Sequence, residues 1–446
     1  MTMALSETSQ VFLDRYAELR GRLAGADLPW LAKIREDAAN TFRVTGVPTP
    51  RMEDWKYTNL KALDALELVF AARPAEVRAD MLPAKLGDGP RLVFVDGRFR
   101  ADLSDSLEIG EGIRLASLAD LLSADPGFIE PRLADFGDNA TGAPMLALNG
   151  AFQEDGYVIA LDANADAGAA IEILFWDTAG EAAAVRQPRN LIVAAANSRA
   201  EIIERHMGAG SSRQFFNGAT LITLDAGAAI GHYRVQSQGA GSVHVNTIRT
   251  RIEADARYES FILAEGGEVA RDEVQVGLMA AGAYARLDGI YLADGAQVLD
   301  STTTTRHAAP NTTCQETYKG ALDGTARAVF QGAIRVEPGA DGTDAQMSNK
   351  TLLLSDDAEI DTKPQLEIYA DEVKCAHGAT TGELDAEAMF YLRSRGIPEV
   401  EARGILVEGF LDEVTEAMDD TPFAHLVRGH VAAWVGRGVK EKEMKG

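Results

Sequence analysis

One repeat restricts the fold of this chain more than any other feature. Between Tyr157 and Thr381 helical periodicity is absent, and short alternating runs follow small or turn-forming residues. A period near 28 residues with several strands per unit indicates a solenoid of stacked β coils, because each coil leaves its edge hydrogen bonds unpaired until the next one stacks on it. An alanine near the start of each run recurs at steps of 31, 28, 28 and 27 residues, at Ala169, Ala200, Ala228, Ala256 and Ala283. A β-sandwich with irregular spacing is the alternative, and the repeat leaves the hand of the coil open.

Helical patterns flank the repeat on both sides. Apolar residues recur at spacings of three and four from about Ser9 to Thr41, and strand-like runs begin near Arg91. After Gly382 amphipathic helical patterns return and continue to the charged tail. We therefore expect an N-terminal helical and mixed region over residues 1–150, a β-helix core over 151–382 and a C-terminal helical domain over 383–446. The last of these would cap the solenoid and offer a docking surface.

Charge and cysteine content exclude several classes of function. The chain has 68 acidic and 43 basic residues, which argues against nucleic-acid binding because phosphate contacts require clustered Lys and Arg. Its two cysteines, Cys314 and Cys375, form no CxxC pair, so a zinc ribbon, a ferredoxin-type site and a disulfide framework are excluded. A bound metal would need histidine, carboxylate or a second chain. No export signal and no membrane-length apolar run is visible, so we expect a cytoplasmic protein without membrane contact.

Four segments resemble a known protein family. The stretch Asp361–Gly382 closely resembles the signature of the SufB/SufD family of the SUF iron–sulfur cluster assembly machinery, and Phe390–Ile397 continues that likeness. Glu53–Thr58 resembles the N-terminal motif of the SufD type, and Ala328–Gly332 is a further family-like element. Two departures favour the SufD type over the SufB type. Residues 352–357 lack the cysteine of SufB-like chains, and His377 lacks their flanking carboxylates.

The resemblance implies a mainly β fold with a right-handed parallel β-helix core flanked by helical domains. It also implies a non-catalytic scaffold subunit of an ATP-dependent assembly complex. Such a subunit pairs with SufB through the two cores, binds the SufC ATPase through its C-terminal helices and aids iron entry. No cofactor is then expected to be bound stably by this chain alone, only transient iron or an iron–sulfur cluster in the complex. A phosphate-binding GxxxxGK[ST] loop is absent, so ATP hydrolysis must come from elsewhere.

Four questions stay open at this point. The rival function from another class is an exported-type β-helical polysaccharide lyase or hydrolase, which shares the fold type but acts alone. A second alternative is a purely structural partner of SufB that supplies no ligand. Flavin binding, and homodimer formation in the absence of SufB, are also undecided by the sequence.

His377 is the first candidate for chemistry, because a neutral imidazole is a competent iron ligand. By the resemblance it would lie at the SufB interface, where its alternative role is a structural hydrogen bond. Cys375 lies two residues earlier, so in a strand both side chains would share one face and could ligand iron or a cluster together. Two ligands cannot complete a tetrahedral site, so a partner chain would be required. A buried hydrophobic role is the alternative for Cys375.

The remaining candidates receive weaker roles. We place Cys314 in a Thr-rich strand that begins at Thr302, where a sulfur-relay role has little support. Trp55 and Tyr57 are interpreted as anchors that hold their segment by burial. Three further histidines could face one side of the solenoid and are expected to be packed or solvated, with no role assigned: His206, His232 and His244.

Overall fold

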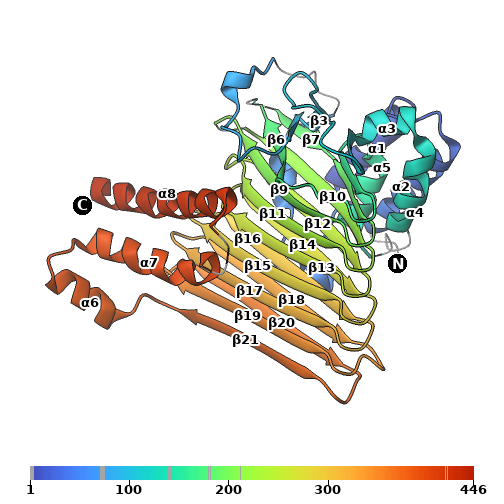
Figure 1. Ribbon diagram of the computed structural model, residues 1–446. Coiled ribbons are helices and arrows are strands. Elements are labelled where there is room, and N and C mark those ends of the chain that lie inside the picture. Colours follow the sequence, from blue (N-terminus) through green and yellow to red (C-terminus); the bar gives the residue numbers. More distant parts are fainter. Residues whose placement is uncertain are drawn as a thin grey trace.

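The computed structural model describes residues 5–70, 76–137, 142–178, 180, 182–210, 212–416, 418 and 420–445. Over these residues the chain is mainly β and forms a parallel β-helix, flattened into two sheets and flanked by helices (Figure 1). From β5 onward, strands alternate between the two sheets, apart from β7 and β8, which lie in the same sheet. Strands two positions apart in the chain therefore stack in parallel on one another.

The 11-stranded sheet follows the order β20-β18-β16-β14-β12-β10-β8-β5-β4, with β7 and β1 beside it. Its strands are β1 (Leu68–Val69), β4 (Ile113–Ser117), β5 (Tyr157–Leu161), β7 (Ala183–Arg186), β8 (Arg189–Ala194), β10 (Gln214–Leu224), β12 (Val243–Ile252), β14 (Val269–Leu278), β16 (Val298–His307), β18 (Arg327–Val336) and β20 (Glu359–Ile368).

The 10-stranded sheet follows the order β21-β19-β17-β15-β13-β11-β9-β6-β2-β3. Its strands are β2 (Arg91–Val95), β3 (Arg98–Phe99), β6 (Ile171–Asp177), β9 (Arg199–Gly208), β11 (Ala229–Ser237), β13 (Arg257–Ala264), β15 (Tyr284–Ala293), β17 (Thr313–Leu322), β19 (Asp344–Leu353) and β21 (Lys374–Gly382). The predicted solenoid is confirmed, and the β-sandwich alternative is wrong because the stacked strands run parallel.

A column of turns explains why Gly, Asn and Asp lead each repeat. The leading residues have φ between 55° and 78°, a region that most side chains avoid and that these three residue types tolerate. Each donates its backbone N–H to the equivalent turn of the next coil, so the turns stack as the strands do. The residues are Asn197, Gly227, Asp255, Gly282, Asn311 and Gly342.

Helices cover the outer faces of both sheets. In the N-terminal region, Phe12, Phe42 and Phe152 pack against Phe215 and its neighbours on the outer face of the 11-stranded sheet. These helices are α1 (Glu7–Leu19), α2 (Pro29–Thr45), α3 (Leu118–Ala124), α4 (Pro126–Gly137) and α5 (Pro144–Phe152), with 3-10 turns η1 (Glu53–Trp55), η2 (Lys61–Ala65) and η3 (Ala79–Met81). Strands β2 and β4 lie between them in sequence and extend the two sheets, so the N-terminal region is continuous with the solenoid.

The C-terminal helices lie on the 10-stranded sheet. They are α6 (Ala386–Ser394), α7 (Glu399–Thr415) and α8 (Pro422–Lys445). Leu411 of α7 and Phe423 of α8 pack against Phe261 and Ile290 on the outer face of that sheet. In contrast, α6 projects away from the strands and has no buried residue (Figure 1). Among the described residues, no helix is both long and apolar enough to cross a membrane.

Candidate functional site at the open end of the solenoid

The solenoid is open at the end formed by β20 and β21. In the described part of the chain, β20 pairs only with β18 and β21 pairs only with β19, so each has one unpaired edge. Most residues of β21 are exposed, whereas the equivalent residues of β17 are mostly buried by the coils on both sides. The segment Asp361–Gly382, singled out in the sequence, therefore forms the terminal coil. Unpaired strand edges are templates for another chain.

His377 and Cys375 both face the interior side of β21. Cys375 is in register with Ala345 and packs against the main core, and His377 is in register with the core residue Met347. Since residues in register on neighbouring strands point to the same face, the imidazole and the thiol lie side by side at the mouth of the solenoid. His377 is exposed and Cys375 is half-buried. The predicted shared face is thus present.

These two side chains form no complete metal site on their own. Burial raises the pKa of the Cys375 thiol, and Asp344 raises it further, while a backbone hydrogen bond from Ala345 lowers it. The thiol is thus mainly protonated at neutral pH, although metal ligation requires a thiolate. The described residues contain no group of three or more His, Cys, Asp or Glu side chains able to hold a metal ion. Ligation by His377 or Cys375 stays a prediction that depends on donors from elsewhere.

Cys314 lies deeper in the same inward column. It is in register with Ala345, which is in turn in register with Cys375, so two strand spacings of about 4.8 Å each separate the cysteines. That separation is too long for a disulfide. Burial raises the pKa of the Cys314 thiol well above its usual range, and the adjacent Glu316 adds to the effect. Cys314 is a buried, protonated thiol.

The predicted strand running from Thr302 through Cys314 is wrong. Thr302 lies on β16 in one sheet, and Cys314 lies on β17 in the other. The chain reverses between them at Asn311, whose φ is 55°. The threonines of β16 nevertheless contact the cysteine across the interior, because Thr305 Oγ1 lies 3.5 Å from Cys314 Sγ.

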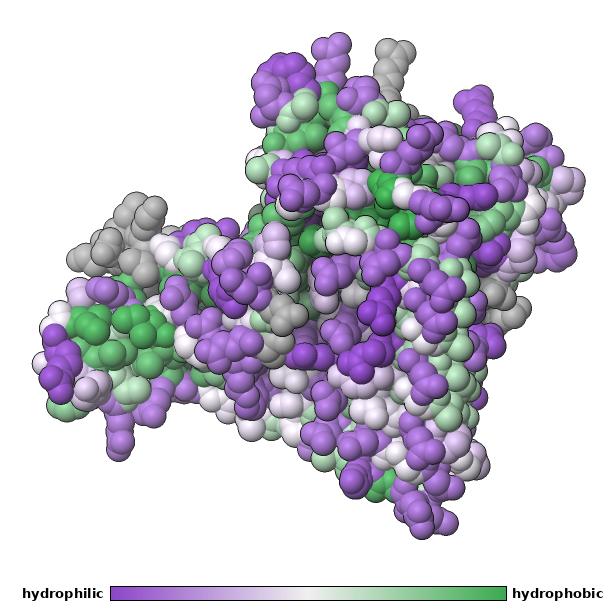
Figure 2. Space-filling view, viewed as in Figure 1, coloured by the Kyte–Doolittle hydropathy of each residue, from purple (hydrophilic) through white to green (hydrophobic). Residues whose placement is uncertain are grey.

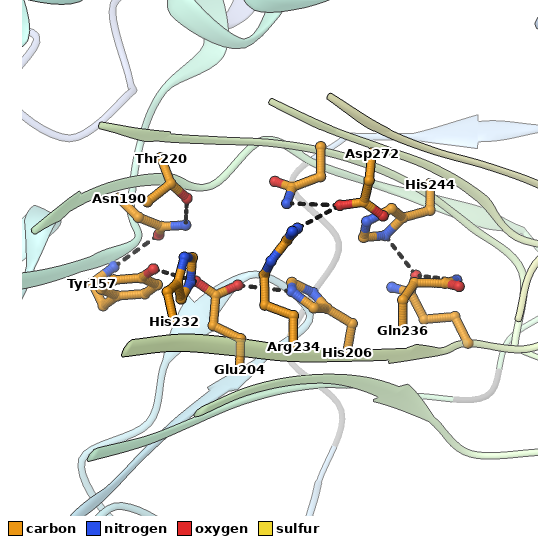
Figure 3. Close-up of polar contacts among 12 residues, drawn as sticks. Tyr157, Asn190, Glu204, His206, Thr220, His232, Arg234, Gln236, His244 and Asp272 are labelled. Atoms are coloured by element: carbon orange, nitrogen blue, oxygen red, sulfur yellow. Dashed lines mark hydrogen bonds and ion pairs between the residues drawn. The ribbon is translucent and has the colours of Figure 1, made fainter. Parts of the chain in front are cut away.

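A buried polar network fills the solenoid interior some coils away from the open end (Figure 3). Glu204 on β9 lies between two imidazoles: His206 Nε2 is 3.0 Å from Glu204 Oε2, and His232 Nε2 is 2.8 Å from Glu204 Oε1. The hydroxyl of Tyr157, on the opposite sheet, donates to the same carboxylate. All of these side chains are almost fully buried. The three donors leave the carboxylate well satisfied without a metal.

The electrostatics of this network favour an ionised Glu204 carboxylate beside a neutral His232 imidazole. Burial alone would raise the pKa of Glu204, but His232 and His206 outweigh it and hold that pKa well below its usual range. Burial lowers the pKa of His232 and, more strongly, that of His244. A neutral His232 can donate from Nε2 to Glu204 while its Nδ1 accepts from the Tyr258 hydroxyl, 3.1 Å away. The network thus joins the two sheets from inside.

The interior network is a feature that sequence reasoning did not find. The histidines were expected to be packed or solvated, and they are packed, but their shared carboxylate was missed. A signal was present: Glu204 and His206 are two residues apart on one strand, and His232 follows one repeat later. Residues with that spacing occupy neighbouring inward positions in a stack of coils.

The N-terminal motif is a structural tie across several coils. Trp55 is buried, and the guanidinium of Arg271 on β14 lies 4.3 Å from its ring centroid. Arg271 pairs with Asp300 on β16 at 2.5 Å, and Thr58 donates to the same carboxylate. Lys363 on β20 reaches Glu53 at 2.5 Å. The predicted anchoring role is thus confirmed for Trp55, and the tie extends to the terminal coil.

The comparisons with known proteins agree with this architecture. A family model described as the SufBD protein N-terminal region matches residues 6–173, and the SufBD core domain of SUF system FeS cluster assembly matches residues 175–410. The chain belongs to the SufBD family. Iron–sulfur cluster assembly protein SufD of Escherichia coli is 33% identical over 381 residues, covering 84% of this chain and 86% of that protein. These likenesses identify the SufD type.

Two further relatives match most of this chain. An iron–sulfur cluster assembly SufBD family protein of Synechocystis is 30% identical over 419 residues, covering 91% of this chain and 90% of that protein. Protein ABCI7, chloroplastic, of Arabidopsis thaliana is 24% identical over 413 residues, or 90% of this chain and 85% of that protein. The SufBD core match ends within α7, so α8 lies beyond it. A role in SUF iron–sulfur cluster assembly follows from the family.

Proposed function

We propose that this chain is the SufD-type scaffold subunit of a cytoplasmic SUF complex and that its terminal coil pairs with a SufB-type subunit. The observation that carries the proposal is the open coil: β20 and β21 each present an unpaired edge within the described residues. A partner that adds a strand to both edges would satisfy these hydrogen-bonding groups and bury the apolar interior exposed there. Ile368 and Tyr369, at the end of β20, are large apolar residues left exposed at this end.

Such pairing would also complete a ligand set. His377 and Cys375 point into the mouth of the solenoid, where a partner's thiolates and carboxylates would lie opposite them. Iron prefers sulfur and imidazole donors in a site of at least four ligands, and this chain offers two. The nascent iron–sulfur cluster is the cargo of this site. In this assignment the subunit gives architectural support, aids iron entry and contributes His377 as an interface ligand.

The C-terminal helices are the proposed docking surface for a SufC-type ATPase. Phe390 and Tyr391 on α6 are 75% and 57% exposed, and Figure 2 shows apolar side chains gathered at the left of the molecule, where α6 lies. A groove beside them is lined by residues of α6 and α7 and by the segment after β19, including Leu354, Arg393 and Arg403. Exposed aromatic residues next to a groove with polar edges are typical of protein interfaces.

Pairing at the terminal coil can be tested with one edge position. Lys374 N–H bonds to the carbonyl of Thr343, the residue just before β19, so by alternation along β21 the N–H of Ala379 faces the free edge. A379P removes that donor without breaking a bond to β19, and A379T retains it. We expect A379P to weaken SufB-type subunit binding by about tenfold or more and A379T to change it little. Equal binding of A379P and the unaltered chain, measured by titration calorimetry, would refute the assignment.

A matched pair of variants, Y391D and V44D, tests the docking of the ATPase. Y391D places a charge on the exposed face of α6, and V44D places one on α2, where Val44 is 78% exposed and far from the C-terminal helices in sequence. Both variants should fold, because neither side chain is buried. We expect Y391D to lose SufC-type ATPase binding by about tenfold and V44D to retain it. Loss in both variants, or in neither, would place the ATPase elsewhere.

A further inference from the structure

A buried lysine connects the C-terminal helices to the coils beside the open end. Lys319 extends from the outer face of β17, and its side chain is only 2% exposed. Its ammonium donates to the backbone carbonyl of Phe410 at 2.5 Å and to the carboxylate of Glu413, and it lies 4.4 Å from the Phe410 ring centroid. All of these partners belong to α7. A buried ammonium is costly unless paired, so Lys319 holds α7 in one position.

The position of Glu413 on its helix points to the same role. Glu413 lies in the last turn of α7, where the helix dipole disfavours an acidic side chain. Lys319 lowers the pKa of Glu413 and Lys350 lowers it further, so both lysines stabilise the charged form. Lys350 is on β19, and its ammonium lies 3.3 Å from Glu413 Oε1. One carboxylate therefore joins the end of α7 to two neighbouring strands.

These strands lead directly to the terminal coil. β19 is the sole strand paired with β21 among the described residues, and Met347 on β19 is in register with His377. Lys350 lies three residues from Met347 on the same strand. Arg403 of α7 adds a third tie, donating to the Leu354 carbonyl just after β19 at 2.8 Å. Side-chain contacts thus tie α7 to β19 and to the segment that follows it.

We propose that the cluster of Lys319, Lys350 and Glu413 couples the C-terminal helices to the terminal coil, so that movement of α7 changes the order of β21 and the presentation of His377. These three are positioning residues and touch no cargo. The coupling rests on the proposed function for its biological purpose, since it links the ATPase docking surface to the subunit interface. The physical link itself is a property of this chain alone.

The first experiment uses the isolated full chain. E413Q removes the charge that both lysines share, and Glu413 is 60% exposed, so folding should survive. We expect amide hydrogen exchange in β19 and β21 to become about fivefold faster or more, while β9 and β11 keep their rates. R257M is the matched control, because it breaks the Arg257–Glu259 pair on the same sheet away from α7. Faster exchange confined to α7, or equal effects of R257M on β21, would overturn the coupling.

The second experiment separates this coupling from the proposed function. In the complex with SufB-type and SufC-type subunits, ATP should alter exchange in β21 of the unaltered chain, and E413Q should reduce that response by about threefold or more. K319M is the second variant, since it keeps the buried stem and loses the ammonium. A full ATP response in both variants, with the complex intact, overturns the coupling. If ATP changes no exchange rate in the unaltered complex, the proposed ATPase docking is contradicted. The coupling between α7 and β21 is then still tested by the exchange rates of the isolated chain.

Discussion

His232 Nε2 lies 2.8 Å from Glu204 Oε1 in the interior of the solenoid, although the two residues are 28 positions apart in the chain. The two residues lie on the neighbouring strands β9 and β11, where His232 is in register with Ile202, two residues before Glu204. Glu204 also accepts from His206 and Tyr157, so three donors converge on one buried carboxylate. An interior that is otherwise largely apolar is thus fixed at this point by a directional polar contact between its two sheets.

Glu204 should be among the least replaceable residues of the fold. In E204Q the amide NH₂ group would face imidazole and hydroxyl donors, leaving buried donors unpaired. We expect a loss of about 3 kcal/mol or more in the free energy of unfolding, measured with urea at pH 7. E201Q, at an exposed position of the same strand, should change it by less than about 0.5 kcal/mol. A loss below about 1 kcal/mol for E204Q would show that the network is not structural.

Acid should destabilise the fold through His307. Burial lowers the pKa of this imidazole from 6.5 to about 4. The pKa of His307 is lower in the folded state than in the unfolded state. Its neutral imidazole therefore contributes fully to the free energy of unfolding above about pH 6.5, and this contribution is lost as the pH falls toward 4. At pH 5 the expected loss is about 2 kcal/mol. The lowered pKa values of His232 and His244 also imply a loss of stability in acid. The test therefore compares H307Q with the unaltered chain. H307Q should lose less free energy of unfolding between pH 7.5 and pH 5.

Much of this fold was predictable from the sequence for a local reason. A turn that needs φ > 0 favours Gly, Asn or Asp, so Gly227, Asp255 and Gly282 mark successive coils in the sequence itself. The buried network left a weaker mark, because the spacing of Glu204, His206 and His232 becomes informative only once the stacking register that turns Glu204 inward is known. The strand error at Cys314 had a related cause: threonine suits both β16 and β17, and the turn at Asn311 was not recognised.

The open end was predictable only in part. The shared face of Cys375 and His377 follows from two-residue alternation in any strand. That this strand is the last one, with an unpaired edge among the described residues, depends on where stacking stops. Strand length does not specify that point, since β21, with 9 residues, is almost as long as β19, with 10.

His377 should matter for cluster assembly and little for stability. Its side chain is exposed, so H377A should leave the free energy of unfolding within about 0.5 kcal/mol and the complex intact. If the imidazole is a ligand, cluster formation in the assembled complex should fall by about tenfold, a scale seen when groups around a metal are altered. T380A, on the outward side of the same strand, is the control. An unchanged cluster yield in an intact H377A complex would favour a purely structural subunit.

Gly320 offers the sharpest test of how closely the coils approach one another. A Cβ atom at this inward position of β17 would lie 1.7 Å from Cε2 of Tyr291 on β15. The ring cannot yield easily, because its hydroxyl donates to Asn349 Oδ1 at 2.8 Å and lies 2.5 Å from Thr351 Oγ1. G320A should therefore lower the free energy of unfolding by about 3 kcal/mol. G378A on the terminal strand meets no atom within 4 Å and should be neutral within about 0.5 kcal/mol. Equal stability of the two variants would mean that the interior is packed more loosely than these distances indicate.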